Sequence, residues 1–194
     1  MNFKTQMTMA NDFAISGYGK ATQSRGAISF AAAAELTGDI EIDGFARIGV
    51  QSNVVASVTG VVSGGMLEVC GTTGTLALAS CNTYTGGTLV AGGVKLRLAD
   101  GESAGTGPVT LDKGVLVFRG TSSMNPIVFT NSVDGIGRIV VEGKASVTFT
   151  DPSMAYVGAA TVYPGTSMAF PALEESDTVV VDAPPANGVM IIVR

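Results

Sequence analysis

The stretch that decides the fold runs from residue 82 to residue 118 and reads NTYTGGTLVAGGVKLRLADGESAGTGPVTLDKGVLVF. Its apolar residues come in short runs that alternate with polar ones, and glycines separate the runs. This pattern is typical of short β-strands joined by tight turns. No apolar stripe of helical length interrupts it. The stretch therefore predicts strands with one dry side and one wet side.

Part of this pattern returns later in the chain at an offset of 72 residues. The offset aligns like residues with one another, among them Tyr84 with Tyr156, Gly65 with Gly137 and Leu67 with Ile139. Repeat proteins stack units of roughly 20 to 50 residues, because one unit alone cannot bury its apolar face. An offset of 72 divides into three coils of about 24 residues. We therefore expect two copies of one unit in an all-β solenoid with parallel strands.

Strand-like runs recur along the chain at the spacing that such a solenoid needs. Each is a few residues long, the length of one side of a coil, and alternation would place one set of side chains inside. The runs cover residues 40–42, 67–69, 76–78, 94–98, 109–111, 115–118, 139–141, 147–149 and 189–193.

The segment from Gly74 to Phe118 resembles the autotransporter passenger-associated repeat. It begins with GTLALAS, continues with NTYTGGT and ends with LADGESAGTGPVTLDKGVLVF, with Cys81 where a small turn residue is expected. The later copy, AYVGAATVYPG from Ala155, keeps little of this motif. The resemblance implies a right-handed parallel β-helix, similar to the pectate-lyase solenoid, that is displayed outside the cell or on its surface as a stalk or adhesin. It implies no activity.

The chain divides into three parts by pattern. Residues 1–38 do not join the repeat and are expected to form an amino-terminal cap or assembly segment, residues 39–173 form the β-helix, and residues 174–194 form a carboxyl-terminal cap strand. Solenoid ends expose unpaired backbone groups, so atypical end segments are expected there. The apolar run 189–193 has two interpretations: it folds back as the last coil, or it docks on a neighbouring subunit by strand addition.

The charge and hydropathy of the chain restrict the classes of partner that it could bind. The formal net charge is −5 and only 14% of the residues are charged, which argues against a nucleic-acid surface. No apolar stretch approaches the 18 or so residues of a membrane span. The first residues, MNFKTQMTMANDF, lack the apolar segment of a secretory signal. The expected partners are a surface glycan, a protein, or another copy of the chain at a solenoid end.

Charged residues provide weak candidates for a site. Alternation places Asp39, Glu41 and Asp43 on one wet row, which could bind calcium, and Lys95 with Arg97 on a basic row that could contact a sugar acid or a partner. A solvated strand face explains both rows as well. The chain has no His, which removes the commonest general base and metal ligand. We assign no catalytic residue and no cofactor, and we expect no enzymatic activity.

The two cysteines are Cys70 and Cys81, which lie on either side of one strand. They cannot form a zinc site without further ligands. Either they are joined by a disulfide across a coil, or they are small buried apolar residues, which the burial preference of free Cys favours.

These observations favour a structural function: a non-enzymatic β-helix module that serves adhesion, spacing or self-assembly at a cell surface. The first alternative is a β-helix that binds or degrades carbohydrate, although aromatic residues make up only 6% of the chain. The second is a fibre or shell protein of a virus or phage.

Overall fold

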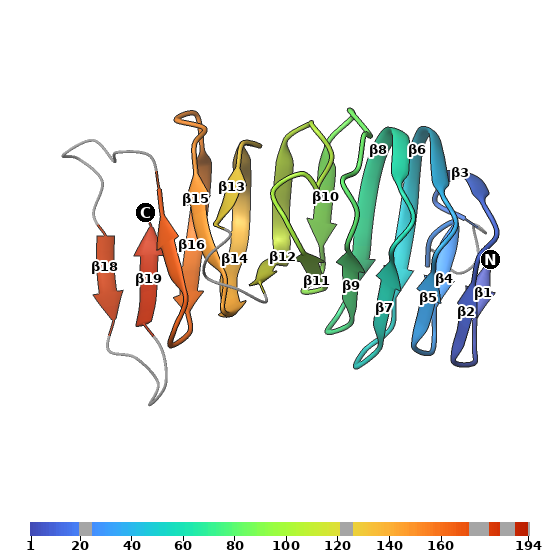
Figure 1. The fold of residues 1–194 in the computed structure, drawn as a ribbon, viewed down its shortest axis with the longest axis horizontal. Helices are drawn as coiled ribbons and strands as arrows, with labels where there is room; N and C mark the ends of the chain where they lie inside the picture. The colour runs from blue at the N-terminus through green and yellow to red at the C-terminus, as the bar shows by residue number, and fades with distance from the viewer. Residues whose placement is uncertain (20–24, 121–125, 171–178, 183–188, 194) are drawn as a thin grey trace.

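The computed structural model of the 194-residue chain describes residues 1–19, 25–120, 126–170, 179–182 and 189–193. The regular structure in these residues is entirely β. Parallel strands stack as a β-solenoid, which confirms the predicted fold class. Figure 1 shows the earliest and the latest strands at opposite ends of an elongated stack.

Each turn of the solenoid has three sides, which we call faces 1, 2 and 3. Face 1 comprises β1 (Asn2–Phe3), β4 (Ile28–Phe30), the second halves of β6 (Ile40–Val50) and β8 (Val62–Gly71), β10 (Thr88–Ala91), and the first halves of β12 (Val109–Gly120), β14 (Val133–Gly143) and β16 (Ala155–Val162). Face 2 comprises β2 (Met7–Met9), β5 (Ala34–Leu36), β7 (Val55–Val58), β9 (Thr75–Leu78), β11 (Lys95–Leu98) and the second halves of β12, β14 and β16. Face 3 comprises β3 (Phe13–Gly17), the first halves of β6 and β8, and then β13 (Ile127–Phe129), β15 (Ser146–Phe149) and β17 (Ser167–Ala169).

The interior consists of apolar side chains stacked from turn to turn. On face 2, Leu76 pairs with Leu96, Leu96 with Leu116, and Leu116 with Ile139, and all four are fully buried. Leu67 is buried as well, so the expectation that Leu67 and Ile139 line a common interior is confirmed. Every strand-like run named from the sequence lies in a strand, except that Val94 of the run 94–98 precedes β11. One dry interior therefore runs through successive turns.

Phenylalanines fill the interior of the later turns. The rings of Phe118, Phe129 and Phe149 meet edge to face, with centroids 5.0 to 5.6 Å apart. Phe170 stacks on Phe149 at 5.0 Å. Aromatic pairs in these arrangements add about 0.5–1.5 kcal/mol each beyond the area that they bury.

The corners of the solenoid require close approach of backbones from adjacent turns. A Cβ on Gly65 would overlap the carbonyl oxygen of Gly44, and a Cβ on Gly137 would lie 2.5 Å from the carbonyl oxygen of Gly114. Side chains are therefore excluded at both corners. Gly65 bends β8 between faces 3 and 1, whereas Gly137 bends β14 between faces 1 and 2.

The predicted repeat of two copies offset by 72 residues is wrong. Leu67 pairs with Thr88, Thr88 with Val109, and Val109 with Val133. Three turns from Leu67 therefore reach Val133 and not Ile139, because most turns take about 20 or 21 residues. The 72-residue offset aligned Gly65 with Gly137 because the backbone of the adjacent turn comes close at both positions, although the two glycines lie at different corners.

The aligned tyrosines are not equivalent either. Tyr84 lies in the segment that leads to β10 and its hydroxyl bonds Thr88 Oγ1 at 2.7 Å, whereas Tyr156 pairs with Gly135 on face 1 and donates to the carbonyl oxygen of Ala159 at 2.7 Å. Both rings are buried. Each fills the inside of its own corner and satisfies a polar group there.

Residues 1–38 are part of the solenoid and not a separate segment beside it. β1 pairs with β4, β2 with β5, and β3 with β6, all in parallel. The boundary expected at residue 39 is therefore absent from strand pairing. The sequence concealed these turns because their strands are only two to five residues long.

The carboxyl-terminal run 189–193 folds back on its own chain. It forms β19 (Val189–Val193), which pairs antiparallel with β16 and with β18 (Val179–Asp182). A strand is present where the sequence predicted one at 189–193, but it runs antiparallel instead of adding another parallel coil. Of the run 174–194, residues 174–178, 183–188 and 194 lie outside the described residues.

The buried leucine ladder of face 2 can be tested by truncation. Leu96→Ala should lower the free energy of unfolding by about 2–5 kcal/mol, because it opens a cavity between Leu76 and Leu116. Urea unfolding followed by circular dichroism measures the loss. Lys95→Ala, at the exposed neighbouring position, should change stability by less than about 0.5 kcal/mol. Equal effects of the two substitutions would contradict the assigned interior.

Candidate functional site: a polar pocket on face 1

The acidic row singled out from the sequence lies on the outside of β6, as alternation predicted. Asp39, Glu41 and Asp43 are exposed. However, Asp39 Oδ1 accepts a hydrogen bond from the Val61 backbone N–H at 2.8 Å, and the Asp39 N–H donates to Asp12 Oδ1 at 2.8 Å. Asp39 therefore links adjacent turns at a corner. Across the described residues, no group of three or more His, Cys, Asp or Glu could hold a metal ion.

Buried asparagines have the same role, Asn82 at this corner and Asn131 at the corner between faces 3 and 1. Asn82 Oδ1 accepts from the Val62 N–H at 2.7 Å, and its Nδ2 donates to the Ser103 carbonyl oxygen at 2.6 Å. In a later turn Asn131 Nδ2 donates to the Gly107 carbonyl oxygen at 2.6 Å. These amides satisfy backbone groups that regular strand pairing leaves open at the bend. Their role is structural.

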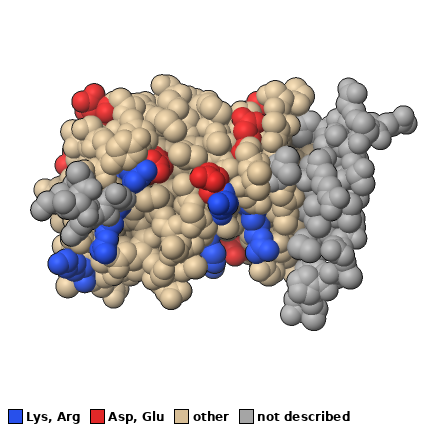
Figure 2. Space-filling view, turned by 180° about the vertical axis from the view of Figure 1, so that it is seen from behind, with Lys and Arg blue, Asp and Glu red and all other residues tan. Residues whose placement is uncertain are grey.

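The basic pair lies on the outside of face 2. Lys95 is exposed and Arg97 is half-buried in β11. Their strand neighbours in the next turn are Val115 and Val117. Figure 2 shows acidic and basic side chains intermixed over one side of the molecule, with neutral surface between them. This side offers no large surface of a single charge.

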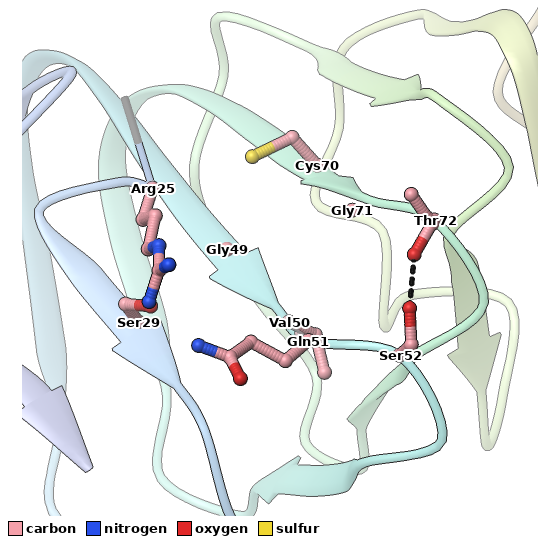
Figure 3. A pocket seen from close by; sticks show the side chains of 9 residues that line it. All are labelled: Arg25, Ser29, Gly49, Val50, Gln51, Ser52, Cys70, Gly71 and Thr72. Carbon is pink, nitrogen blue, oxygen red and sulfur yellow. Dashed lines mark hydrogen bonds between the residues drawn. The ribbon is translucent and has the colours of Figure 1, made fainter. Parts of the chain in front are cut away.

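A pocket lies on the outside of face 1. It has a volume of about 530 Å³, and Figure 3 shows its lining: Arg25, Ser29, Gly49, Val50, Gln51, Ser52, Cys70, Gly71 and Thr72. Ser29, Gly49 and Cys70 are neighbours on adjacent strands. The middle position of this row is Gly49, which is buried.

Gly49 also seats the chain that precedes β4. A Cβ at Gly49 would overlap the carbonyl oxygen of Arg25, so only glycine allows this backbone to rest on the strand. Figure 3 shows the Arg25 side chain on one side of the pocket and the Cys70 thiol on the other, with the Gln51 amide directed between them. The hydroxyls of Ser52 and Thr72 hydrogen-bond to each other at the corner.

Beside the pocket, an ion pair neutralises the nearest carboxylate. Arg47 Nη2 lies 2.7 Å from Glu68 Oε1, and Glu68 is only 5% exposed. Tyr18 covers the pair, with the Arg47 guanidinium 4.5 Å above its ring and the ring of Phe45 4.7 Å away. Of the described residues that line the pocket, Arg25 alone carries a charge. The local field of the pocket is therefore positive.

Both cysteines are free thiols. Cys70 is half-buried, and desolvation raises its pKa, with the Arg47 guanidinium acting in the opposite direction. Cys81 is exposed, contrary to the expectation of two buried cysteines, because it lies at the turn after β9. A hydrogen bond with Glu102 and the charge of Asp100 raise the Cys81 pKa. Neither thiol is activated as a nucleophile.

The pocket was not predicted from the sequence. The residues missed are Arg25, Ser29, Gln51 and Thr72, which come from three different turns. One signal pointed to it: Gly49 interrupts an apolar strand, and a glycine inside a strand often marks close approach of another backbone or a ligand.

Comparison with known proteins identifies no relative, so a function can be inferred only from the fold and the surface of this chain. No family model, curated protein or solved structure matches the chain. Within the described residues, no helix has the length and hydropathy needed to cross a membrane.

The Glu102 contact predicts how Cys81 reacts. Glu102→Gln should lower the Cys81 pKa, because it removes the negative charge that opposes ionisation. At pH 7 a larger fraction of thiolate would then be present, so alkylation by iodoacetamide should be faster, with the midpoint of its pH–rate profile at lower pH. A Cys70→Ser background isolates the signal. Glu41→Gln, which removes an equal charge from β6, should leave the profile unchanged, and no shift with Glu102→Gln would contradict the assignment.

Proposed function

We propose that the chain is a non-enzymatic structural module of an extracellular or surface-displayed protein, where it acts as a rigid rod for adhesion, spacing or assembly, as autotransporter-like passengers do. One observation carries this proposal: the unbroken parallel stack from β1 to β16. Bending such a stack would separate many hydrogen-bonded strands and open the shared interior at the same time.

The first turn supports a role in assembly. β1, β2 and β3 pair with the second turn only, so their outer edges are free among the described residues. Phe3, Met9 and Phe13 use their backbone groups toward the second turn: the Ala31 N–H donates to Phe3 O, the Thr37 N–H donates to Met9 O, and the Phe13 N–H donates to Asp39 O. Because alternate residues of a strand direct their backbone groups to opposite sides, those of Asn2, Thr8 and Ala14 face outward.

Each face thus presents backbone groups for one more strand at this end. We infer that a second copy of the chain occupies this edge, with the two first turns in antiparallel register about a twofold axis. Such an arrangement lets the same edge serve both partners, as in an isologous dimer. It also removes an open edge that would otherwise invite uncontrolled aggregation.

Surface display is tested in cells of the source organism. A membrane-impermeant biotin ester should label the protein on intact cells, through exposed lysines such as Lys95, as strongly as after lysis. A cytosolic protein of the same cells should be labelled after lysis only. Labelling that requires lysis would contradict surface display, and recovery of the protein in purified virus particles would favour the viral alternative.

Self-association through the first turn is tested with proline. Thr8→Pro with Ala14→Pro removes two outward N–H groups and keeps the bonds to the second turn, since proline is tolerated at sheet edges. Light scattering after size exclusion should give a dimer for the wild-type chain and a monomer for this variant. Thr8→Ser with Ala14→Ser keeps both N–H groups and should remain dimeric. A monomeric wild type, or a dimeric proline variant, would overturn the edge as the interface.

A further inference from the structure

The pocket on face 1 combines features that a merely structural groove does not need. Ser29 is only 4% exposed, yet it lines the pocket beside Gly49. The hydroxyl of Ser29, the amide of Gln51 and the hydroxyls of Ser52 and Thr72 surround the hollow together with the guanidinium of Arg25. Pockets for small molecules have volumes of about 300–1,000 Å³ and a few convergent polar groups. At about 530 Å³ this pocket lies within that range.

We propose that the face-1 pocket binds a small hydroxylated anion, with its carboxylate or phosphate group held by Arg25. The inference does not rest on the structural role of the module, and either can fail without the other.

Charge selects an anion here although the whole chain is negative. The formal net charge is −5, so attraction must be local. Glu68 lies in β8, two residues before the pocket residue Cys70. Its carboxylate is paired with Arg47 and does not compete for Arg25. A planar guanidinium binds carboxylate and phosphate oxygens through two parallel hydrogen bonds. The charged end of the ligand therefore belongs at Arg25.

The rest of the ligand must be polar and hydroxylated. Opposite Arg25 the lining consists mainly of alcohol, amide and thiol groups with glycine backbone between them; Val50 is its one aliphatic side chain, and no aromatic ring is among the described lining residues. Such groups both donate and accept hydrogen bonds, as hydroxyls of a polyol do. The pocket contains no described carboxylate, so a ligand with an ammonium group would leave its cation unpaired. The charge of the lining therefore favours hydroxy acids and polyol phosphates over amino acids.

Calorimetric titration with four probes tests the ligand class. Gluconate and glycerol 3-phosphate carry the anionic groups, and sorbitol and glycerol are their uncharged counterparts. At least one of the two anions should bind at least about tenfold more tightly than its counterpart, because a hydrogen bond to a charged group contributes about 1.5–3 kcal/mol. Comparison of the two anions shows whether carboxylate or phosphate is preferred. Equal binding of anions and neutral polyols, or no binding of either anion, would overturn the proposal.

Two substitutions test the role of Arg25. Arg25→Gln should weaken binding of the anion at least about tenfold, because it retains a polar group but removes the charge. Lys95→Gln removes the same charge from face 2 and should leave affinity unchanged within twofold. Gly49→Ala should weaken binding as well, since the new methyl group displaces the Arg25 backbone. Equal losses for Arg25→Gln and Lys95→Gln would show a non-specific charge effect and reject the site.

Cys70 provides a native reporter for the location. In a Cys81→Ser background, N-ethylmaleimide can label Cys70 only, and the bound anion should slow this labelling in proportion to the occupancy measured by calorimetry. Sorbitol at the same concentration should not. Binding without protection of Cys70 would place the anion elsewhere and overturn the assignment. Circular dichroism of each variant separates loss of binding from loss of the fold.

Discussion

No turn of this chain has an interior of its own, so each can bury its apolar side chains only against the turns on either side. This constraint determines the rest of the structure. The face-2 strands β9 and β11 contain only four residues each, yet Leu76 and Leu96 are completely buried because each is paired with residues of the turns on both sides. Parallel pairing follows, since the chain must climb in one direction to repeat the same path. Among the described residues, the strands of the first turn have a partner on one side only.

The corners impose a second requirement, which is to turn the chain without leaving buried backbone groups unsatisfied. Glycine allows adjacent backbones to touch, as Gly65 and Gly137 do. Asn82 and Asn131 replace the backbone hydrogen bonds that the bend removes. Tyr84 fills another corner from within and bonds to Thr88. The residues that looked most like motif positions in the sequence are therefore components of the bends.

Function is restricted to the outer surface, because the interior is filled by side chains. The stack itself accounts for a rigid module, and its first turn offers backbone groups to a second copy. The pocket on face 1 is a local departure from this regular exterior. It lies where the backbone at Arg25 rests directly on Gly49, which only glycine allows. A rod and a binding site can thus coexist, since the site uses only outward positions and disturbs none of the buried ladder.

The sequence by itself determined the fold class, because alternation of apolar and polar residues depends only on neighbours along the chain. The strand at Val189–Val193 and the wet positions of Asp39, Glu41 and Asp43 were predicted in the same way. The number of residues in a turn, and hence which residues stack, was decided only by the tertiary structure, since loops of different lengths can close the same coil. For that reason Leu67 lies in line with Val133 instead of Ile139. The pocket was hidden for the same reason: Arg25, Gly49 and Cys70 come from three successive turns, and only stacking brings them together.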